Sequence, residues 1–409
     1  MMYVIIGGSA AAIGCIDGIR QVDKHGAITL VTDEAKFNYS RPLISYLLEG
    51  KTTEEKMCYR SDEWFLQNNV NIISGVKAQK LDAKAKTIAL SNGDTLPYDN
   101  VLIATGSRPF VPPTQGYDTV LQKHTFMTLE SAKALAASLN KDSRVLIVGA
   151  GLTGVKCAEG IRSLCKEITI VDLAPRVLPA VLDEKGSAMV QKRMEDNGVK
   201  FYLGDLVEKF DKTTATLKSG TVLDFDVLVM AVGVRPNTQL VSDAGGEVNR
   251  GIIIDNACRT TLPFVYSAGD CTEGYDAVSG EKRMLPLWPN AMLQGETAGH
   301  NMAGGNADFT QGMAINASGV FGLHMVTAGS YDGESYVEEK DGSYKRLITA
   351  DGVLKGVIMV GDVARAGIYT SLIRKRKPLS EIDFELIKES PQLMAFSKGD
   401  RAKQLGGEV

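Results

Sequence analysis

The feature that most constrains the fold is a glycine loop near the middle of the chain. Four apolar residues, Val145–Val148, indicate a buried strand, and Gly149, Gly151 and Gly154 follow it as G-x-G-x-x-G at the start of a helix. Asp172 closes the next apolar run, 23 residues after the first glycine (172 − 149). Such glycines let the backbone approach a pyrophosphate at the helix N-terminus, and the later acid accepts hydrogen bonds from a ribose. Strand, loop, helix and acid in this order predict a dinucleotide-binding unit.

A second, altered copy of this unit begins the chain. Tyr3–Ile6 indicates a buried strand, and Gly7 opens a loop of small residues in the phosphate-binding position. Ser9 and Ala12 stand where the second and third glycines of such a loop usually stand. Ser9 is small, and its hydroxyl can add a hydrogen bond to a phosphate. We therefore expect a second nucleotide at this loop.

The residues that follow the first unit supply a ribose acid and a phosphate-binding arginine. Thr32 occupies the place where the acid is expected, and Asp33 and Glu34 come directly after it, so either acid is a candidate. In the dipeptide Arg41-Pro42 the proline suits a first helical turn and keeps the preceding arginine extended. We expect Arg41 to point away from the helix toward a phosphate or another cofactor oxygen. The alternative is a solvated arginine at a helix start.

Each of the two loops is followed by a return strand of the same plan. Val101–Ala104 runs into a turn at Gly106 and then Arg-Pro, and Val227–Met230 runs into a turn at Gly233 and then Arg-Pro. The loops are 142 residues apart (149 − 7) and the turn glycines 127 (233 − 106). This repetition predicts an α/β fold with two Rossmann-like nucleotide-binding domains.

Composition excludes several other classes of protein. The chain has 409 residues, a formal charge of −4 and 44% hydrophobic residues, which fits a globular protein of two or three domains and gives no support for nucleic-acid binding. We expect no membrane span, because no apolar run approaches the roughly 20 residues required. The first strand starts at Tyr3, which leaves no room for a signal peptide, so we expect a cytoplasmic protein. The six cysteines contain no C-x-x-C pair and are expected to be free thiols. We expect no metal site.

Five motifs together resemble a known family. They are Gly7–Ala12 (GGSAAA), Ala104–Pro109 (ATGSRP), Gly149–Gly154 (GAGLTG), Ala231–Pro236 (AVGVRP) and Ser267–Cys271 (SAGDC). Their order is similar to that of the FAD-dependent pyridine nucleotide-disulfide oxidoreductase superfamily over residues 1–310. Within it, Tyr39–Ser45 (YSRPLIS) and Leu287–Ala291 (LWPNA) resemble the branch that contains NADH:rubredoxin reductase and the flavin module of assimilatory nitrite reductase.

The resemblance implies a glutathione-reductase-type arrangement in which the second nucleotide-binding domain is inserted in the first. The expected parts are an FAD-binding domain (1–112 and 245–308), an NAD(P)H-binding domain (113–244), a small α+β C-terminal domain (309–395) and a loose polar tail (396–409). Outside the motifs, we expect helices over Glu54–Asn69 and Ala364–Lys375.

The resemblance also implies a role for each motif. FAD would contact Gly7, Ser9, Ala10, Ala11, Asp33 or Glu34, Arg41, Pro42, the backbone of Val76, Thr105, Gly106, Gly269, Asp270, Leu287 and Trp288. The nicotinamide nucleotide would contact Gly149, Gly151, Leu152, Thr153, Gly154, Asp172 and Gly233. The acid at Asp172 repels a 2′-phosphate, which favours NADH over NADPH, although Arg176 nearby keeps NADPH as the less favoured alternative.

One departure from the family concerns its redox-active cysteines. Disulfide reductases carry C-x-x-x-x-C, and the peroxidase and coenzyme A reductase relatives a single cysteine, in the helix that faces the flavin. Residues 40–48 of this chain contain no cysteine, Cys58 lies too far along, and Cys15 on the nucleotide helix is expected to be a core residue. Thiol-relay chemistry therefore lacks its nucleophile.

A second departure concerns a charged pair beside the flavin. Ferredoxin-reductase-like members have a lysine and a glutamate there, and the corresponding positions of this chain hold Tyr46 and Lys156. Our hypothesis is that Lys156 supplies the positive charge beside the isoalloxazine, with Tyr46 as its neighbour. The alternative is a lysine that points into solvent.

These features favour an enzyme that passes hydride from NADH to FAD and then delivers electrons to an external acceptor, either a small rubredoxin- or ferredoxin-type carrier or dioxygen. An alternative is an FAD- and NADH-binding electron-transfer subunit of a larger iron–sulfur complex, whose clusters would lie on another chain. A thiol–disulfide reductase is less favoured.

The basic run Arg374–Lys377 is a candidate docking site for an acidic carrier, although a solvated helix end balanced by Glu381, Asp383 and Glu385 is the more ordinary interpretation. A homodimer is a further option.

Overall fold

The computed structural model describes residues 1–392 and residue 396, so the expected tail lies, apart from Phe396, outside the described residues. The chain forms two compact units. The first contains Met1–Pro175, Gly198–Tyr275 and Glu281–Thr310. The second contains Arg176–Asn197, Asp276–Gly280 and the described residues from Gln311 onward.

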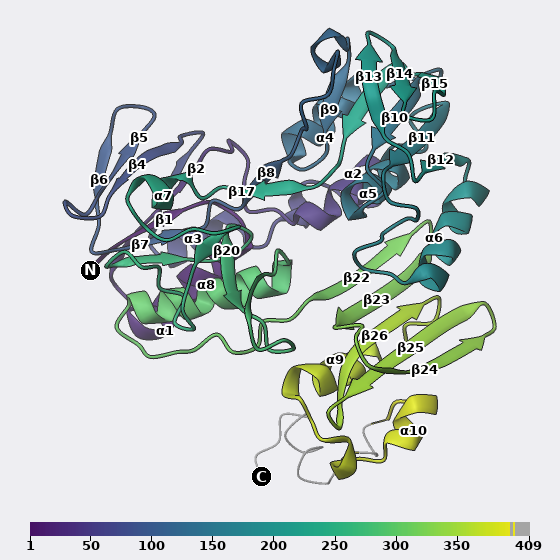
Figure 1. Ribbon diagram of the computed structural model, residues 1–409. Coiled ribbons are helices and arrows are strands. Elements are labelled where there is room, and N and C mark those ends of the chain that lie inside the picture. Colours follow the sequence, from purple (N-terminus) through teal and green to yellow (C-terminus); the bar gives the residue numbers. More distant parts are fainter. Residues whose placement is uncertain (393–395, 397–409) are drawn as a thin grey trace. The chain divides into compact units, whose positions relative to one another are not determined.

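The first unit contains two parallel five-stranded sheets of the same plan (Figure 1). One has the order β19-β7-β1-β2-β3, formed by Val265–Ser267, Asn100–Ile103, Met2–Ile6, Ala27–Thr32 and Val70–Ser74. The other has the order β9-β16-β10-β11-β12, formed by Lys123–Thr125, Val227–Met230, Arg144–Val148, Glu167–Asp172 and Val199–Leu203. In each sheet the strand that precedes the glycine loop lies at the centre. The fold is therefore α/β with two Rossmann-like halves.

Smaller sheets accompany the two parallel ones. Three antiparallel or mixed sets are present: β4-β5-β6 (Ala78–Asp82, Thr87–Leu90, Thr95–Pro97), β13-β14-β15 (Val207–Asp211, Thr214–Leu217, Val222–Asp224) and β18-β20-β21 (Ile252–Ile253, Thr272–Tyr275, Lys282–Met284). The two Arg-Pro segments found in the sequence pair with each other, because β8 (Ser107–Pro109) runs antiparallel to β17 (Val234–Pro236) with Arg108 opposite Arg235. The repeat is thus a physical contact between the two halves of the first unit.

Helices α1 (Ala10–Val22) and α8 (Trp288–Met302) lie side by side (Figure 1). Glycines on both helices bring their backbones together: a Cβ added to Gly295 would lie 2.0 Å from the Ala11 carbonyl oxygen, and one added to Gly299 would lie 2.0 Å from that of Cys15. Only glycine permits this approach, which places the start of α8 next to the first glycine loop.

The first unit contains further helices, and one of them lies in a region where a longer helix was expected. They are α2 (Ile44–Leu48), α3 (Asp62–Gln67), α4 (Leu129–Ala137), α5 (Leu152–Ile161), α7 (Gln239–Asp243) and short 3₁₀ turns at Arg41–Leu43, Glu55–Met57 and Tyr117–Thr119. The expected helix over Glu54–Asn69 is wrong. It is interrupted after Met57, because residues 58–60 pair with the chain at 38–40 and Ser61 caps a new helix by accepting a hydrogen bond from the Trp64 N–H.

The second unit is an antiparallel sheet with helices, as expected for a small α+β domain. Its strand order is β22-β23-β26-β25-β24 (Ile315–Val320, Leu323–Gly329, Val353–Val360, Ser343–Ala350, Glu334–Lys340), and its helices are α6 (Glu184–Asp196), α9 (Ala366–Lys375), α10 (Phe384–Glu389) and a 3₁₀ turn at Leu379–Glu381. Tyr369, Leu372 and Ile373 of α9 are buried in its core. Helix α6 belongs to this unit although it lies between β11 and β12 in sequence.

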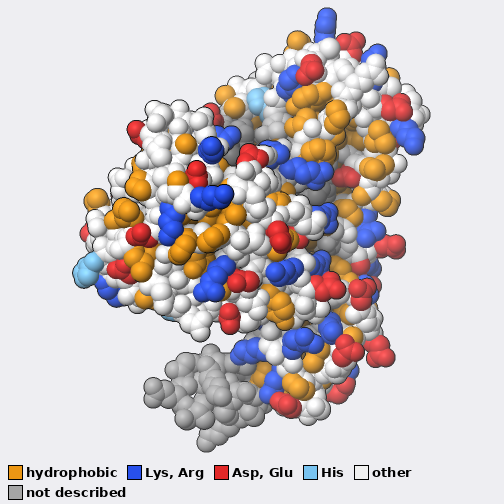
Figure 2. Space-filling model, turned by 60° about the vertical axis from the view of Figure 1, so that its left-hand side comes forward, with side chains coloured by type: hydrophobic (Ala, Val, Ile, Leu, Met, Phe, Trp, Pro, Cys, Tyr) orange, Lys and Arg blue, Asp and Glu red, His pale blue; other side chains and the backbone are white. Residues whose placement is uncertain are grey.

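No helix in the described part of the chain is long and apolar enough to cross a membrane. On the face drawn in Figure 2, basic and acidic side chains are interspersed rather than gathered into areas of one sign. That distribution agrees with the small net charge and does not resemble a nucleic-acid-binding surface.

Candidate functional site

The two glycine loops have the same backbone geometry. Gly7 and Gly149 have φ angles of 122° and 117°, in the region that favours glycine. A Cβ at Gly7 would lie 2.1 Å from the Ala104 carbonyl oxygen, and a Cβ at Gly149 would lie 2.3 Å from that of Ala231. Ala104 and Ala231 directly follow the two return strands, β7 and β16, so the repeat seen in the sequence extends to individual contacts.

The second loop has room for a ligand where the family motif requires it. A Cβ at Gly154 would lie 1.9 Å from the Gly149 carbonyl oxygen, so the third glycine serves helix–loop packing. A Cβ at Gly151 would meet no atom within 4 Å among the described residues. Leu152 and Thr153 begin α5 directly after it. The middle glycine thus faces open space at a helix N-terminus, which suits a pyrophosphate.

The N-termini of the two loop helices have similar surroundings. In the described chain, neither α1 nor α5 has an acidic residue in its first turn, and neither N-cap residue, Ser9 or Gly151, forms a side-chain cap hydrogen bond. Ala10 and Ala11 form the first turn of α1 and are buried. A helix N-terminus without an acidic first turn suits a phosphate group, because the helix dipole favours negative charge there.

The predicted ribose acid of the second loop lies against that loop. Asp172 accepts hydrogen bonds from the Ala150 N–H at 2.5 Å and from the Ala174 N–H at 2.7 Å. It is the last residue of β11 and holds the loop and the chain after the strand together. Its position at the carboxyl end of the strand is the one expected for a residue that contacts a ribose.

The two candidate acids after β2 differ in their surroundings. Glu34 forms an ion pair with Arg41 and accepts a hydrogen bond from the Tyr39 hydroxyl at 2.5 Å, whereas Asp33 is exposed. Tyr39 in turn accepts a hydrogen bond from the Leu129 N–H at 3.0 Å. Glu34 therefore positions Arg41, and Asp33 is the more exposed of the two candidate acids.

Arg41 forms an ion pair with Glu34 and is near enough to Asp270 to act on it electrostatically. Besides its pair with Glu34, it donates a hydrogen bond to the Met127 carbonyl at 3.0 Å and lies 5.6 Å from the centroid of the Tyr39 ring. Burial raises the pKa of Asp270, and the nearby Arg41 guanidinium lowers it in turn. Arg41 and Asp270, which are far apart in sequence, thus occupy one site, with Pro42 in the first turn after the arginine.

Sequence reasoning missed a residue that holds the Asp270 turn. Gln294 of α8 is 2% exposed, and its side-chain oxygen accepts hydrogen bonds from the Gly269 N–H at 2.8 Å and from the Thr272 hydroxyl at 3.2 Å. Gly269 has a φ of 84°. Gln294 is a positioning residue for this turn, and no local sequence signal marks it.

The turn at Thr105 and Gly106 is held from the other half of the first unit. The Thr105 hydroxyl donates to the Asn237 carbonyl at 2.7 Å, and the Asn237 side-chain amide donates back to the Thr105 carbonyl at 2.9 Å. The Asn237 N–H donates to the Gly106 carbonyl at 2.9 Å. Gly233, in the equivalent turn, has a φ of 106° and open space around it. Asn237 was not predicted as a site residue, although it directly follows the Arg-Pro repeat.

Three further predicted residues lie near the first loop. The Val76 N–H donates to the Thr32 carbonyl at 3.0 Å, which ties Val76 to the end of β2. Leu287 caps α8, and Trp288 begins it. Trp288 is 46% exposed, and its ring lies 5.9 Å from that of Tyr59 between centroids.

The two residues that replace the family's charged pair do meet. The Lys156 ammonium lies 4.5 Å from the centroid of the Tyr46 ring, a cation–π contact between α5 and α2. Lys156 also forms an ion pair with Glu159, and the two side chains are only 14% and 4% exposed. The alternative of a solvated lysine is wrong. The positive charge is partly neutralised by Glu159, which sequence reasoning did not consider.

The cysteines lead to a first prediction. Cys15, Cys157, Cys165, Cys258 and Cys271 are buried and Cys58 is exposed. Burial raises the pKa of Cys157 and of Cys15, so both thiols stay protonated at neutral pH. We expect one thiol per native chain to react rapidly with an aromatic disulfide reagent, and modification to leave NADH oxidation by a dye unchanged. Replacing Cys58 with serine should abolish the fast phase; loss of dye reduction on labelling would contradict the absence of thiol chemistry.

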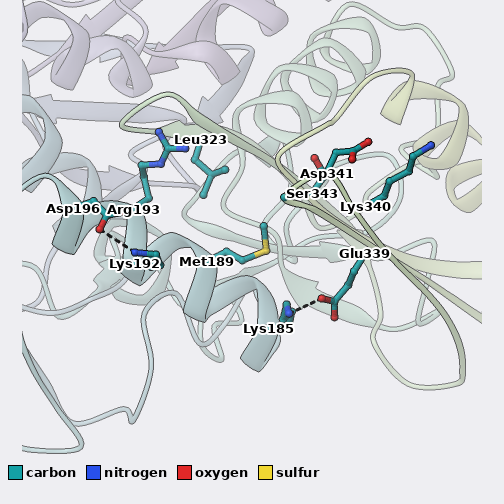
Figure 3. Close-up of a pocket in the computed structure, with 11 residues that line it drawn as sticks. Lys185, Met189, Lys192, Arg193, Asp196, Leu323, Glu339, Lys340, Asp341 and Ser343 are labelled. Carbon is teal, nitrogen blue, oxygen red and sulfur yellow. Dashed lines mark hydrogen bonds and ion pairs between the residues drawn. The ribbon is translucent and has the colours of Figure 1, made fainter.

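A surface pocket of about 520 Å³ lies in the second unit, between α6 and the turn that joins β24 to β25 (Figure 3). Lys185 pairs with Glu339 at 2.6 Å, and Lys192 pairs with Asp196 at 3.1 Å. Its described lining contains no predicted site residue. Paired, solvated charges of this kind do not resemble a nucleotide site.

A family model and several known proteins match this chain. Residues 1–295 match the family model described as pyridine nucleotide-disulphide oxidoreductase. The chain is 32% identical over 393 residues to the NADH-dependent phenylglyoxylate dehydrogenase subunit epsilon of Aromatoleum evansii, covering 93% of each. It is 32% identical over 321 residues to an NADH oxidase of Methanocaldococcus jannaschii, covering 76% of this chain and 71% of the relative.

A solved structure of a covalent putidaredoxin reductase–putidaredoxin complex shares the fold, with a TM-score of 0.87 and 23% identity over 100% of this chain and 99% of the other. The family model covers most of the sequence and includes both glycine loops. The chain therefore belongs to the pyridine nucleotide-disulphide oxidoreductase family, and it is a flavoprotein oxidoreductase that uses FAD and NADH.

Proposed function

We propose that this protein binds FAD at the first loop and NADH at the second, and that it delivers electrons from NADH through FAD to an external redox partner. The observation that carries the proposal is the pair of loops with matching backbone geometry, Gly7 and Gly149, in two sheets of one plan. FAD, when bound, supplies the hydride-accepting and electron-donating chemistry.

The predicted domain division is part of the proposal. Strand β19 completes the first sheet although it follows the whole second sheet in sequence, which is what an inserted NADH domain requires. We assign 1–112 and 245–308 to FAD, 113–244 to NADH and 309–395 to a C-terminal domain.

The side chains of the site would bind FAD and NADH and hold the turns around them in position. Arg41 would neutralise phosphate charge, Asp33 would accept from a ribose of FAD, and Asp172 would accept from a ribose of NADH. Gln294 and Asn237 hold the turns at Asp270 and Thr105. Asp172 would repel a 2′-phosphate, so we assign NADH rather than NADPH.

Lys156 provides a test of how the protein tunes the flavin. Replacing Lys156 with methionine removes one positive charge from this position, so we expect the flavin reduction potential to fall, by about 30 mV if the charge contributes about 1.4 kcal/mol, and hydride transfer to slow. Glu159→Gln should shift the potential in the opposite direction. Potentials measured with reference dyes and stopped-flow reduction by NADH check both; an unchanged potential and rate in Lys156→Met would refute the role.

A second candidate is a subunit that relays electrons inside a larger complex. The observation that favours it is the end-to-end match to a relative named as a dehydrogenase subunit, which covers 93% of both chains. The iron–sulfur centres would then lie on a partner chain. Copurification with such a chain, together with poor activity of the isolated protein toward every small acceptor, would establish this candidate.

The acceptor and its docking surface are tested together. The protein is reduced with NADH under anaerobic conditions and reoxidised in parallel with oxygen, rubredoxin, ferredoxin and quinone. Consumption of two electrons per flavin rather than four would exclude a dithiol centre.

The Arg374–Lys377 run is our candidate for carrier docking, although Lys377 pairs with Glu381 at 2.5 Å and Glu385 with Lys388 at 2.5 Å. Carrier reduction that falls steeply with salt while dye reduction does not would favour docking there. We place the reaction in the cytoplasm.

A further inference from the structure

Helices α2 and α5 make a close backbone contact inside the first unit. A Cβ added to Gly160 of α5 would lie 3.1 Å from the Ser45 Cα atom, 3.1 Å from the Ser45 carbonyl oxygen and 3.3 Å from the Ser45 Cβ atom. The two carbon–carbon distances are shorter than the optimal separation of about 3.5–4.0 Å. Both residues are buried. Glycine at position 160 therefore lets α5 approach α2 more closely than a residue with a side chain would.

A second contact between the same helices lies one helical turn away. Lys156 and Gly160 are four residues apart (160 − 156), so they lie on the same face of α5. Tyr46 follows Ser45 directly in α2, and the Lys156 ammonium lies 4.5 Å from the centroid of its ring. Neighbouring residues of α2 thus meet neighbouring turns of α5, and the two helices have one defined spacing.

The ring of Tyr46 is held by two cations. Besides Lys156, the Lys51 ammonium lies 5.7 Å from the ring centroid. Each ammonium has a carboxylate of its own, because Glu49 pairs with Lys51 and Glu159 pairs with Lys156. These carboxylates reduce the repulsion between two like charges beside one ring. Both cation–π contacts can therefore exist together and keep Tyr46 in place against α5.

The contact joins the two Rossmann-like halves of the first unit. Helix α2 follows the Arg41-Pro42 turn of the first half, and α5 begins directly after Gly151 in the second half. The halves are also joined where β8 pairs with β17. Because there are two separate connections, pushing α2 and α5 apart would tilt one half slightly against the other and leave each glycine loop intact.

We propose that Ser45 and Gly160 are positioning residues for hydride transfer, because their contact sets the spacing between the half that binds FAD and the half that binds NADH. This rests on the proposed function, in which NADH is oxidised to NAD⁺ and FAD is reduced. Hydride transfer needs reacting atoms about 3–3.5 Å apart, and a displacement of 1 Å can lower the rate about 100-fold. Each nucleotide is held by its own loop, so the spacing should change the rate of transfer and not the affinities.

Gly160→Ala tests the spacing. The added methyl group must push the two helices apart by a few tenths of an ångström. We expect the limiting rate constant of flavin reduction by NADH to fall about fourfold, which is a sensitivity of about 100-fold per ångström applied to about 0.3 Å. The NADH dissociation constant and the FAD content should stay unchanged. Stopped-flow reduction over a range of NADH concentrations separates the rate constant from the dissociation constant.

Gly367→Ala is the matched control. Gly367 also lies in a helix, α9, and an added Cβ there would meet no described atom within 4 Å. It should leave the limiting rate constant unchanged. Alanine forms helices better than glycine, so a slower reaction in Gly160→Ala would not come from a weaker helix.

Two further measurements do not depend on turnover. Saturating NAD⁺ should perturb the visible absorption of bound, oxidised FAD less in Gly160→Ala than in the wild type, with the same NAD⁺ dissociation constant. Ser45→Gly removes the Cβ atom that the new methyl group meets, so the apoprotein of Ser45→Gly/Gly160→Ala should be more stable than the sum of the two single changes in melting temperature predicts. The double variant should also recover part of the lost rate.

The proposal would be overturned by a wild-type limiting rate constant in Gly160→Ala, by an equal loss in Gly367→Ala, or by additive melting temperatures in the Ser45 and Gly160 variants. A loss of rate that is explained by weaker NADH binding would also overturn it. Failure of NADH to reduce the wild-type protein loaded with FAD would instead overturn the proposed function.

Discussion

Replacing Gly151 with valine is expected to lower kcat/KM for NADH by roughly 100-fold, or about 2.7 kcal/mol, while the protein keeps its fold and its FAD. Gly151 has a φ of −76° and a ψ of −179°, an extended conformation that valine adopts without strain. An added Cβ meets no described atom within 4 Å, so the new side chain projects into the space that the proposal gives to the NADH pyrophosphate.

This variant separates ligand loss from misfolding because the neighbouring glycines behave differently. An added Cβ at Gly149 or Gly154 would lie within 2.3 Å or 1.9 Å of a backbone oxygen, so substitution there should reduce folded yield. Gly367→Val is a control, since Gly367 also has open space, in helix α9 of the second unit. Steady-state kinetics with a dye, the NADH dissociation constant and FAD content per chain are the measurements. Normal NADH affinity in Gly151→Val would show that NADH does not bind at this loop.

Replacing Arg41 with alanine is expected to weaken FAD binding by on the order of 100-fold, so that the protein is isolated largely as apoprotein. Arg41 is the cation next to Glu34 and Asp270. Without it, both carboxylates would repel the diphosphate, in addition to the loss of its own hydrogen bonds. FAD content after purification and titration of the apoprotein with FAD measure the effect.

A double variant tests this electrostatic explanation. In Arg41→Ala/Glu34→Gln one of the unopposed charges is removed, so FAD should bind more tightly than in Arg41→Ala alone. Arg144→Ala is the matched control: Arg144 pairs with Asp226 at 2.9 Å at the amino end of β10, where loss of an exposed pair costs about 0–1 kcal/mol. If Arg41→Ala retains wild-type FAD content, Arg41 does not bind the diphosphate.

Much of the fold follows from local sequence patterns. The apolar strands before Gly7 and Gly149, the small residues after them and the Arg-Pro repeats are consecutive in the chain, and each identifies a strand, a turn or a helix start by itself. The helix expected over Glu54–Asn69 failed for the opposite reason. Its middle pairs with residues 38–40, and this tertiary contact overrides the helical propensity of the segment.

The partners of the site residues depended on the tertiary structure. The sequence left Asp33 and Glu34 as alternative ribose acids and predicted Lys156 as a positive charge beside the flavin. In the folded chain Glu34 forms an ion pair with Arg41, and Lys156 forms one with Glu159. Gln294 and Asn237 hold turns that precede them by 25 and 132 residues.

The sequence by itself determined that this chain has two nucleotide-binding loops and no cysteine in the helix that faces the flavin in its relatives, because both are properties of short consecutive segments. Only the tertiary structure decided which charges are neutralised and which side chains hold the turns of the site. Gln294 reaches the Gly269 N–H across 25 residues (294 − 269), and such a contact leaves no pattern in the sequence around either residue.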